Sequence, residues 1–274
     1  MNMRTLRSVV TAACVAVAMC GMSGIAAFAA EGDAAPRAKA KAAAKPRRHS
    51  GHPDATVARD RLQMLNKRTK QLWWKERHEA KLAEIAASGG KYDLVLLGDS
   101  ITHRWDRTGY GSNVLARLEK KYKVLDIGYG ADHTEQVLWR ITEGRELDGY
   151  KARVVALMIG TNNSRGYKPA NVAEGIKKIV GIIREKQPEA KVVLTAILPR
   201  YGDSDEKKKM RANNDAVNAI IKDYADGKNV FWLDMNPKFP PLDGDWKAVC
   251  PDSTHPVEPG YEIWAAELEP YLAK

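Results

Sequence analysis

Five short apolar runs recur along the chain, and each ends at a glycine, a proline or an aspartate. They are rich in Val, Ile and Leu and lack the polar alternation of a half-exposed strand. Such runs are typical of parallel strands that are buried on both faces. The pattern therefore predicts five parallel strands, at Asp93–Leu97, Lys123–Ile127, Arg153–Ile159, Lys191–Leu198 and Asn229–Leu233.

Helical patterns alternate with these strands. A long one precedes the first strand, from Thr56 to about Ala87, and ends at Ser88-Gly89-Gly90. The alternation predicts the α/β class, as a flavodoxin-like three-layer α/β/α sandwich with right-handed connections. The other predicted helices are Asn113–Lys121, Thr134–Gly144, Asn171–Lys186, Lys207–Ala225 and Pro259–Leu272.

The first thirty residues have the pattern of a secretory signal peptide. Arg4 and Arg7 precede an apolar stretch from Val9 to about Ala18, and Ala27-Phe28-Ala29 has the form of a cleavage site. A transmembrane anchor is the alternative, but the stretch is short for that and glycine and serine interrupt it. Cys20 leaves open the alternative that the segment is a lipoprotein signal. We expect residues 1–30 to be removed, which predicts an exported protein, periplasmic or secreted, without stable membrane insertion.

A basic segment follows, and together with the first thirty residues it carries most of the chain's net charge. Residues 31–53 are rich in Ala, Lys, Arg and Pro and have almost no large apolar residue, which predicts a disordered linker before a domain at 54–274. Residues 1–50 hold eight Lys or Arg and two acids, so they contribute +6 of the net +10. The domain is only mildly basic, which argues against a nucleic acid partner.

The candidate chemistry begins at Ser100, which follows the first predicted strand in Gly98-Asp99-Ser100. Ligands bind at the carboxyl ends of the strands in open α/β sheets. Asp252-Ser253-Thr254-His255-Pro256 supplies a base, because a carboxylate three residues before a histidine can hold the imidazole and leave its second nitrogen facing the serine. An N-cap serine and a surface turn are the structural alternatives. We predict Ser100 as nucleophile, His255 as base and Asp252 as its acid.

An oxyanion formed at Ser100 needs hydrogen-bond donors, and two further strand ends offer them. Asn162 lies in Gly160-Thr161-Asn162-Asn163 after the third strand, and Gly130 and Ala131 precede Asp132 after the second. The alternatives are turn-forming residues and an Asp N-cap. The predicted oxyanion hole comprises Ser100, Ala131, Gly130 and Asn162, with the choice between the Ala131 and Gly130 N–H groups open.

These four segments occur in the order of the conserved blocks of the SGNH (GDSL-like) hydrolase family, which the chain resembles over roughly residues 70–270. Gly130-Ala131-Asp132-His133-Thr134 followed by Val137-Leu138-Trp139-Arg140 is most similar to the branch that contains the alpha subunits of platelet-activating-factor acetylhydrolase and many bacterial exported esterases. The resemblance implies the roles given above. Ala131 is a departure, because the family has glycine there, and the donor survives unless the position needs a positive φ.

The resulting hypothesis is an exported serine esterase that hydrolyses short-chain esters, namely acetyl esters. The favoured substrates are O-acetyl groups on carbohydrates. The alternatives are a lysophospholipase or short-chain lipid esterase, and a non-catalytic glycan-binding module. No metal and no cofactor are predicted, Cys250 is assigned to packing, and acyl length, alcohol and oligomeric state stay open. Four side chains are assigned either to the substrate pocket or to packing: His103, Trp105, Tyr129 and His133.

Overall fold

A five-stranded sheet forms the centre of the computed structural model, which describes residues 54–61 and 72–273. Within those residues the strand order is β2-β1-β3-β4-β5, and every neighbouring pair is parallel. This is the flavodoxin-like order, so the predicted α/β class and the five parallel strands are confirmed. The strands are β1 Lys91–Gly98, β2 Val124–Gly128, β3 Lys151–Met158, β4 Lys191–Thr195 and β5 Val230–Leu233.

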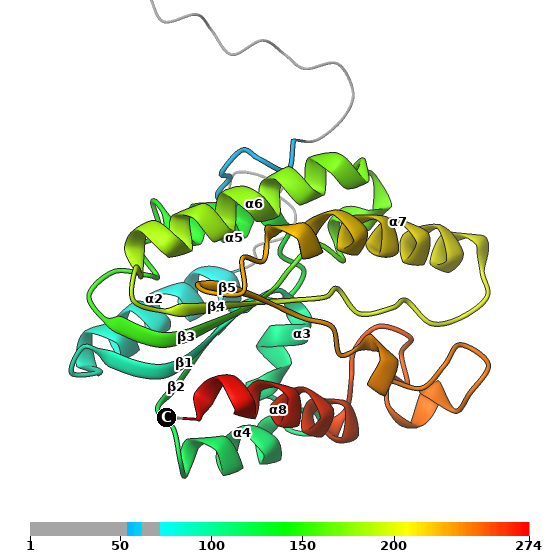
Figure 1. Ribbon diagram of the computed structural model, residues 1–274. Helices are drawn as coiled ribbons and strands as arrows, with labels where there is room; N and C mark the ends of the chain where they lie inside the picture. The colour runs from blue at the N-terminus through cyan, green and yellow to red at the C-terminus, as the bar shows by residue number, and fades with distance from the viewer. Residues whose placement is uncertain (1–53, 62–71, 274) are drawn as a thin grey trace, which may run out of the picture. The chain divides into compact units, whose positions relative to one another are not determined.

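Helices cover both faces of the sheet (Figure 1). One buried cluster joins the sheet to α2, α5, α6 and α7, and a second joins its other face to α4 and α8. Strands enclosed in this way need no polar face, which explains the unbroken apolar runs. The helices are α2 Leu72–Ala87, α3 Ser100–His103, α4 Ser112–Glu119, α5 Thr134–Ile141, α6 Pro169–Lys186, α7 Asp205–Ile221 and α8 Glu258–Leu272.

The start of the predicted helix Thr56–Ala87 is wrong. Residues 54–60 form a turn and an irregular segment that docks on α5 and α6. The Ala55 N–H donates to Asn171 Oδ1 at 2.9 Å, and its carbonyl accepts from Thr134 Oγ1 at 2.9 Å. Gly175 permits this approach, since a Cβ there would lie 2.4 Å from the Ala55 oxygen. Tertiary hydrogen bonds have overridden the helical pattern.

The predicted signal peptide, residues 1–30, and linker, residues 31–53, lie outside the described residues and stay predictions. The described residues belong to one unit of the chain, His49–Lys274. None of the helices described in that unit combines the length and apolar character that a membrane span requires.

Candidate active site

Ser100 lies where β1, β2 and a short helix meet with almost no space between them. It is the first residue of α3, and Asp99 Oδ1 caps the helix by accepting the Ile101 N–H at 2.9 Å. A Cβ on Gly98 would lie 2.2 Å from Thr102 Oγ1, and one on Gly128 would lie 2.2 Å from His103 N. Glycine at these two strand ends lets α3 sit against the sheet, which fixes the position of the serine.

Ser100, His255 and Asp252 form a continuous hydrogen-bonded chain. Ser100 Oγ lies 2.8 Å from His255 Nε2, and His255 Nδ1 lies 2.7 Å from Asp252 Oδ2. Asp252 Oδ1 also accepts the backbone N–H groups of Thr254 and His255, at 3.0 and 2.7 Å. The structure thus brings together three residues that are up to 155 positions apart, in the geometry that activates a serine nucleophile.

The protonation states suit that geometry. Burial opposes ionisation of Asp252, but the two backbone N–H groups and His255 outweigh it and lower the pKa of Asp252 to about 2. Burial lowers the pKa of His255 below its usual 6.5; Asp252 opposes this shift, and the Arg104 and Arg200 cations favour it. At neutral pH the pair is therefore a carboxylate and a neutral imidazole, ready to accept a proton.

The loops after β2 and β3 carry hydrogen-bond donors, and these donors are not equally available to a ligand. The Gly130 N–H is already donated to His103 Nδ1 at 3.0 Å. The Ala131 N–H has no acceptor among the described residues. Asn162 Nδ2 donates one hydrogen to the Asp132 carbonyl at 2.8 Å, which leaves its second hydrogen for a ligand. Of the two backbone donors left open by the sequence, the geometry favours Ala131 over Gly130.

Ala131 has φ of 60°, in the left-handed region that favours glycine. We expect Ala131→Gly to raise the free energy of unfolding by roughly 0.5–1 kcal/mol, because relief of the Cβ clash exceeds the added entropy of the unfolded chain. Urea denaturation measures this. Ala83→Gly, on the exposed face of α2, is the control and should lower stability by about 1 kcal/mol. Equal losses in both variants would contradict the strain at Ala131.

A buried ionic network holds this loop, and the sequence did not predict it. Arg140 is fully buried and its Nε donates to Asp132 Oδ2 at 2.9 Å, while Nη1 ion-pairs with Glu146. Nη1 and Nη2 also donate to the carbonyls of Ile127 and Gly98, at 3.0 and 3.1 Å. Asp132 therefore faces the core, and His133 takes the N-cap position of α5 that an Asp N-cap would have occupied. Arg140 joins the ends of β1 and β2 to the loop that carries Ala131.

The other candidate side chains divide between packing and the site. Trp105 and Tyr129 are fully buried in the two core clusters, and buried Cys250 has its thiol pKa raised to about 12 by burial. His103 is also buried and accepts the Gly130 N–H, so it supports the loop. His133 lines a pocket beside Asn162. Trp105, Tyr129 and Cys250 are therefore packing residues, whereas His103 and His133 each line one of the pockets at the site.

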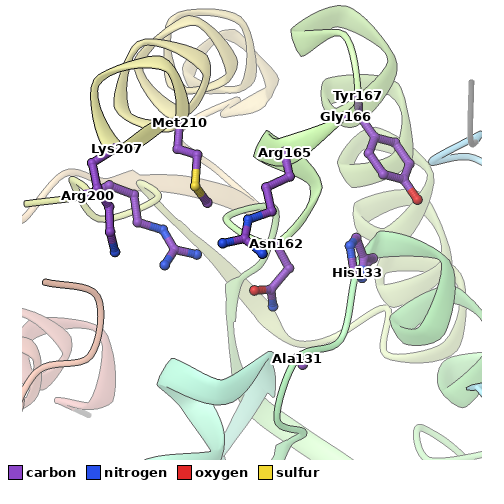
Figure 2. Close-up of a pocket in the computed structure, with 9 residues that line it drawn as sticks. All are labelled: Ala131, His133, Asn162, Arg165, Gly166, Tyr167, Arg200, Lys207 and Met210. Carbon is purple, nitrogen blue, oxygen red and sulfur yellow. The ribbon is translucent and has the colours of Figure 1, made fainter. Parts of the chain in front are cut away.

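Two pockets border the serine and its donors. The first, of about 470 Å³, contains Ala131 and Asn162 on its wall together with His133, Arg165 and Arg200 (Figure 2). The second, of about 500 Å³, contains Ser100 and Gly130 on its wall together with Trp73, Arg104 and Tyr110.

In the described part of the chain, no three His, Cys, Asp or Glu residues form a cluster suited to a metal ion.

Comparison with known proteins supports the resemblance of the four blocks. Residues 96–263 match the GDSL-like lipase/acylhydrolase family. Over 153 residues the chain is 32% identical to platelet-activating factor acetylhydrolase IB subunit alpha1 of Bos taurus, covering 56% of this chain and 62% of that protein. The chain thus matches less than two thirds of the length of that relative.

Solved structures share the fold at lower identity. A GDSL-like lipase from Bacteroides thetaiotaomicron superposes with a TM-score of 0.55 and 21% identity, over 71% of this chain and 96% of that one. An acetylxylan esterase from Geobacillus stearothermophilus superposes with a TM-score of 0.53 and 20% identity, over 68% and 96%. The family match includes the end of β1, Ser100, the Ala131 loop and Asn162. This chain belongs to the GDSL-like lipase/acylhydrolase family.

Proposed function

We propose that this protein is a serine esterase in which Ser100 attacks the ester carbonyl. The observation that carries the proposal is the unbroken contact from Ser100 Oγ through His255 to Asp252. His255 Nε2 takes the serine proton as the Oγ–carbon bond forms. It then gives that proton to the leaving alkoxide as the ester C–O bond breaks. Water repeats the sequence on the acyl-enzyme, releasing the acid and restoring Ser100.

Negative charge develops on the carbonyl oxygen in the transition state. We assign its stabilisation to two hydrogen-bond donors, the Ala131 N–H and the second hydrogen of Asn162 Nδ2. Asn162 is held in place by its bond to the Asp132 carbonyl, and Ala131 by the neighbouring Gly130–His103 bond. Donors that are fixed before reaction pay little reorganisation cost when the charge appears. The Ser100 N–H, at the start of α3, is a third candidate from the sequence.

The substrate we propose is a short-chain, acetyl ester on a carbohydrate. The pocket that contains Asn162 is lined largely by polar and charged side chains, which suit a polar alcohol better than a long acyl chain. Trp73 and Tyr110 supply aromatic surfaces in the Ser100 pocket, where a sugar ring can stack. The structural similarity to an acetylxylan esterase agrees with this choice.

Initial rates on 4-nitrophenyl esters from acetate to octanoate, and acetate release from acetylated xylo-oligosaccharides, test the substrate proposal. We expect kcat/KM to be highest for acetate and to fall with chain length, and acetate to be released from the oligosaccharide. The relative that is a platelet-activating factor acetylhydrolase subunit makes a short-chain lipid esterase the second candidate. Faster cleavage of acetylated lysophospholipid, with no release from the oligosaccharide, would favour it.

The pH dependence of kcat/KM follows from the state of His255. The imidazole must be neutral, so activity is expected to fall as pH drops through a His255 pKa that burial and nearby cations keep below 6.5. Arg104 is one of those cations, and its Nη1 lies 3.3 Å from Asp252 Oδ2. In Arg104→Gln the pKa of His255 should rise, and the acid limb should move to higher pH.

A pH–rate profile of kcat/KM for 4-nitrophenyl acetate measures that shift. Arg107→Gln is the matched control. Arg107 and Arg104 both line the pocket that contains Ser100, but Arg107 contacts His103 rather than Asp252. Its acid limb should stay with that of the parent. An Arg104→Gln profile that coincides with the parent profile would remove Arg104 from the control of His255.

We also propose that the protein is exported. The support is the order of Arg4 and Arg7, the apolar stretch after Val9 and Ala27-Phe28-Ala29. N-terminal sequencing of protein recovered from outside the cytoplasm is expected to begin close to Ala30 or Glu31. An intact Met1 in the recovered protein would contradict cleavage.

A further inference from the structure

Three cationic side chains converge on the pocket that contains Asn162, which we call the cationic pocket. Arg165 follows β3, Arg200 follows β4, and Lys207 lies in the first turn of α7. In Figure 2 the guanidinium groups of Arg165 and Arg200 face each other beside the Asn162 side chain, and Lys207 lies next to Arg200. Three chain segments thus bring positive charge to the wall of the proposed oxyanion hole.

Arg200 is the central member, and its own hydrogen bonds do not neutralise it. Its side chain is buried, with the residue only 7% exposed, and it donates to Thr161 Oγ1, the Thr161 carbonyl and Thr254 Oγ1. All three acceptors are neutral oxygens. A buried cation that lacks an ion-pair partner is costly, so a site that keeps one favours an anionic ligand.

Lys207 lies beside Arg200, and its contact is likewise with a neutral oxygen. Its Nζ lies 3.4 Å from Thr254 Oγ1, the same oxygen that Arg200 Nη1 contacts at 2.5 Å. No ion pair to a carboxylate is formed by either side chain within the described residues. Burial and then the Arg200 cation lower the pKa of Lys207, and Asp252 and Glu206 only partly oppose this.

The carboxylates near the pocket leave an excess of positive charge. Glu206 pairs with Arg165 at 2.8 Å, but both side chains are exposed, at 59% and 70%, so water and salt screen that pair. Asp252 is held by His255 and Arg104. Asp99 and Asp252 favour the Arg200 cation electrostatically, yet burial outweighs them and its pKa is lowered.

We propose that the cationic pocket binds an anionic group, a carboxylate or a phosphate, carried by the alcohol part of the ester. The inference rests on the proposed function, because an acetyl group has no ionisable atom and the charge must belong to the alcohol. Arg200 and Lys207 hold the anion beside Asn162, and Arg165 contributes from the exposed rim. The preferred substrate class is then an acetylated acidic sugar or an acetylated phosphate-bearing alcohol, with neutral acetylated sugars cleaved more slowly.

Matched substrates test the proposal directly. Acetyl esters of methyl glucuronoside and methyl glucoside differ only by a carboxylate in place of a hydroxymethyl group, and acetyl methyl glucoside 6-phosphate supplies the phosphate. We expect kcat/KM to be at least tenfold higher for one of the anionic esters than for the neutral one. Which anionic ester wins identifies the source of the charge. Equal kcat/KM values for all three would overturn the anion site.

Variants of α7 locate the effect. Lys207→Met is expected to lower the ratio of anionic to neutral kcat/KM at least tenfold, and Lys207→Glu to lower it further. Lys208→Met is the control, because Lys208 is exposed on the next position of α7 and does not line the pocket. The control should keep the parent ratio. A Lys207→Met enzyme that keeps that ratio, or a Lys208→Met enzyme that loses it equally, would overturn the assignment.

A binding measurement separates this inference from the esterase proposal. Calorimetry with glucuronate or inorganic phosphate requires no turnover, and we expect binding to the parent that Lys207→Met loses. Binding without any ester hydrolysis would leave the anion site in place and overturn the esterase. Hydrolysis of neutral esters without anion binding or anion preference would leave the esterase in place and overturn the anion site.

Discussion

Replacement of Ser100 by alanine is expected to lower kcat for 4-nitrophenyl acetate by on the order of 10⁴-fold or more. The hydroxyl at 2.8 Å from His255 Nε2 is the atom that forms the acyl-enzyme, and alanine leaves nothing in its place. What remains is the contribution of the oxyanion donors and of substrate binding. Stopped assays at high enzyme concentration, corrected for spontaneous hydrolysis, measure the loss.

Ser112→Ala is the control for that loss. Ser112 begins α4 and lines neither pocket at the site, so its variant should keep the parent kcat within about twofold. Both variants should keep the circular dichroism spectrum and thermal midpoint of the parent. A folded Ser100→Ala protein that retains more than a tenth of the parent kcat would exclude Ser100 as the nucleophile.

Arg140→Met is expected to cost about 3–5 kcal/mol of stability, the largest loss of any single change considered for this fold. Arg140 and both of its carboxylate partners are fully buried, so the variant leaves Asp132 and Glu146 without their shared cation. Two strand-end carbonyls, those of Gly98 and Ile127, lose a donor as well. Met fills much of the volume, so the loss reports charge and hydrogen bonding rather than a cavity.

Urea denaturation at several pH values checks this prediction. Without Arg140, Asp132 keeps its contact with Arg61 and Glu146 keeps its contact with His78. Burial is still expected to raise the folded-state pKa values of both carboxylates above their unfolded values, so they would favour folding only at low pH. The deficit of Arg140→Met should therefore shrink as pH falls toward 4. Arg117→Met is the control, because Arg117 pairs with Glu258 and Glu262 at the surface and should cost under about 1 kcal/mol. Equal losses would contradict the importance of the buried network.

The parallel sheet and the pairing of His255 with Asp252 were predictable because each depends on local signals. Apolar runs buried on both faces define the strands, and parallel strands place their carboxyl ends at one edge of the sheet. Asp252 and His255 lie within one turn, so their contact needs no long-range information. The contact between His255 and Ser100, which lie 155 positions apart, could be established only from the folded structure.

Long-range pairing explains what the sequence left undetermined. The choice between Gly130 and Ala131 depends on His103, which lies 27 positions earlier and takes the Gly130 N–H. The direction of Asp132 depends on a buried partner eight positions later, and the path of residues 54–60 depends on Asn171 and Thr134. None of these partners is marked by periodicity or by a motif. The same is true of the convergence of Arg165, Arg200 and Lys207, which lie after β3, after β4 and in α7.

Covalent labelling with a fluorophosphonate tests whether Ser100 is a nucleophile activated by His255. Mass spectrometry of the digested protein is predicted to find one phosphonylated residue, Ser100, and the label should be lost in Ser100→Ala and strongly slowed in His255→Ala. Absence of label from the folded parent protein, or label on a residue other than Ser100, would exclude Ser100 as the activated nucleophile.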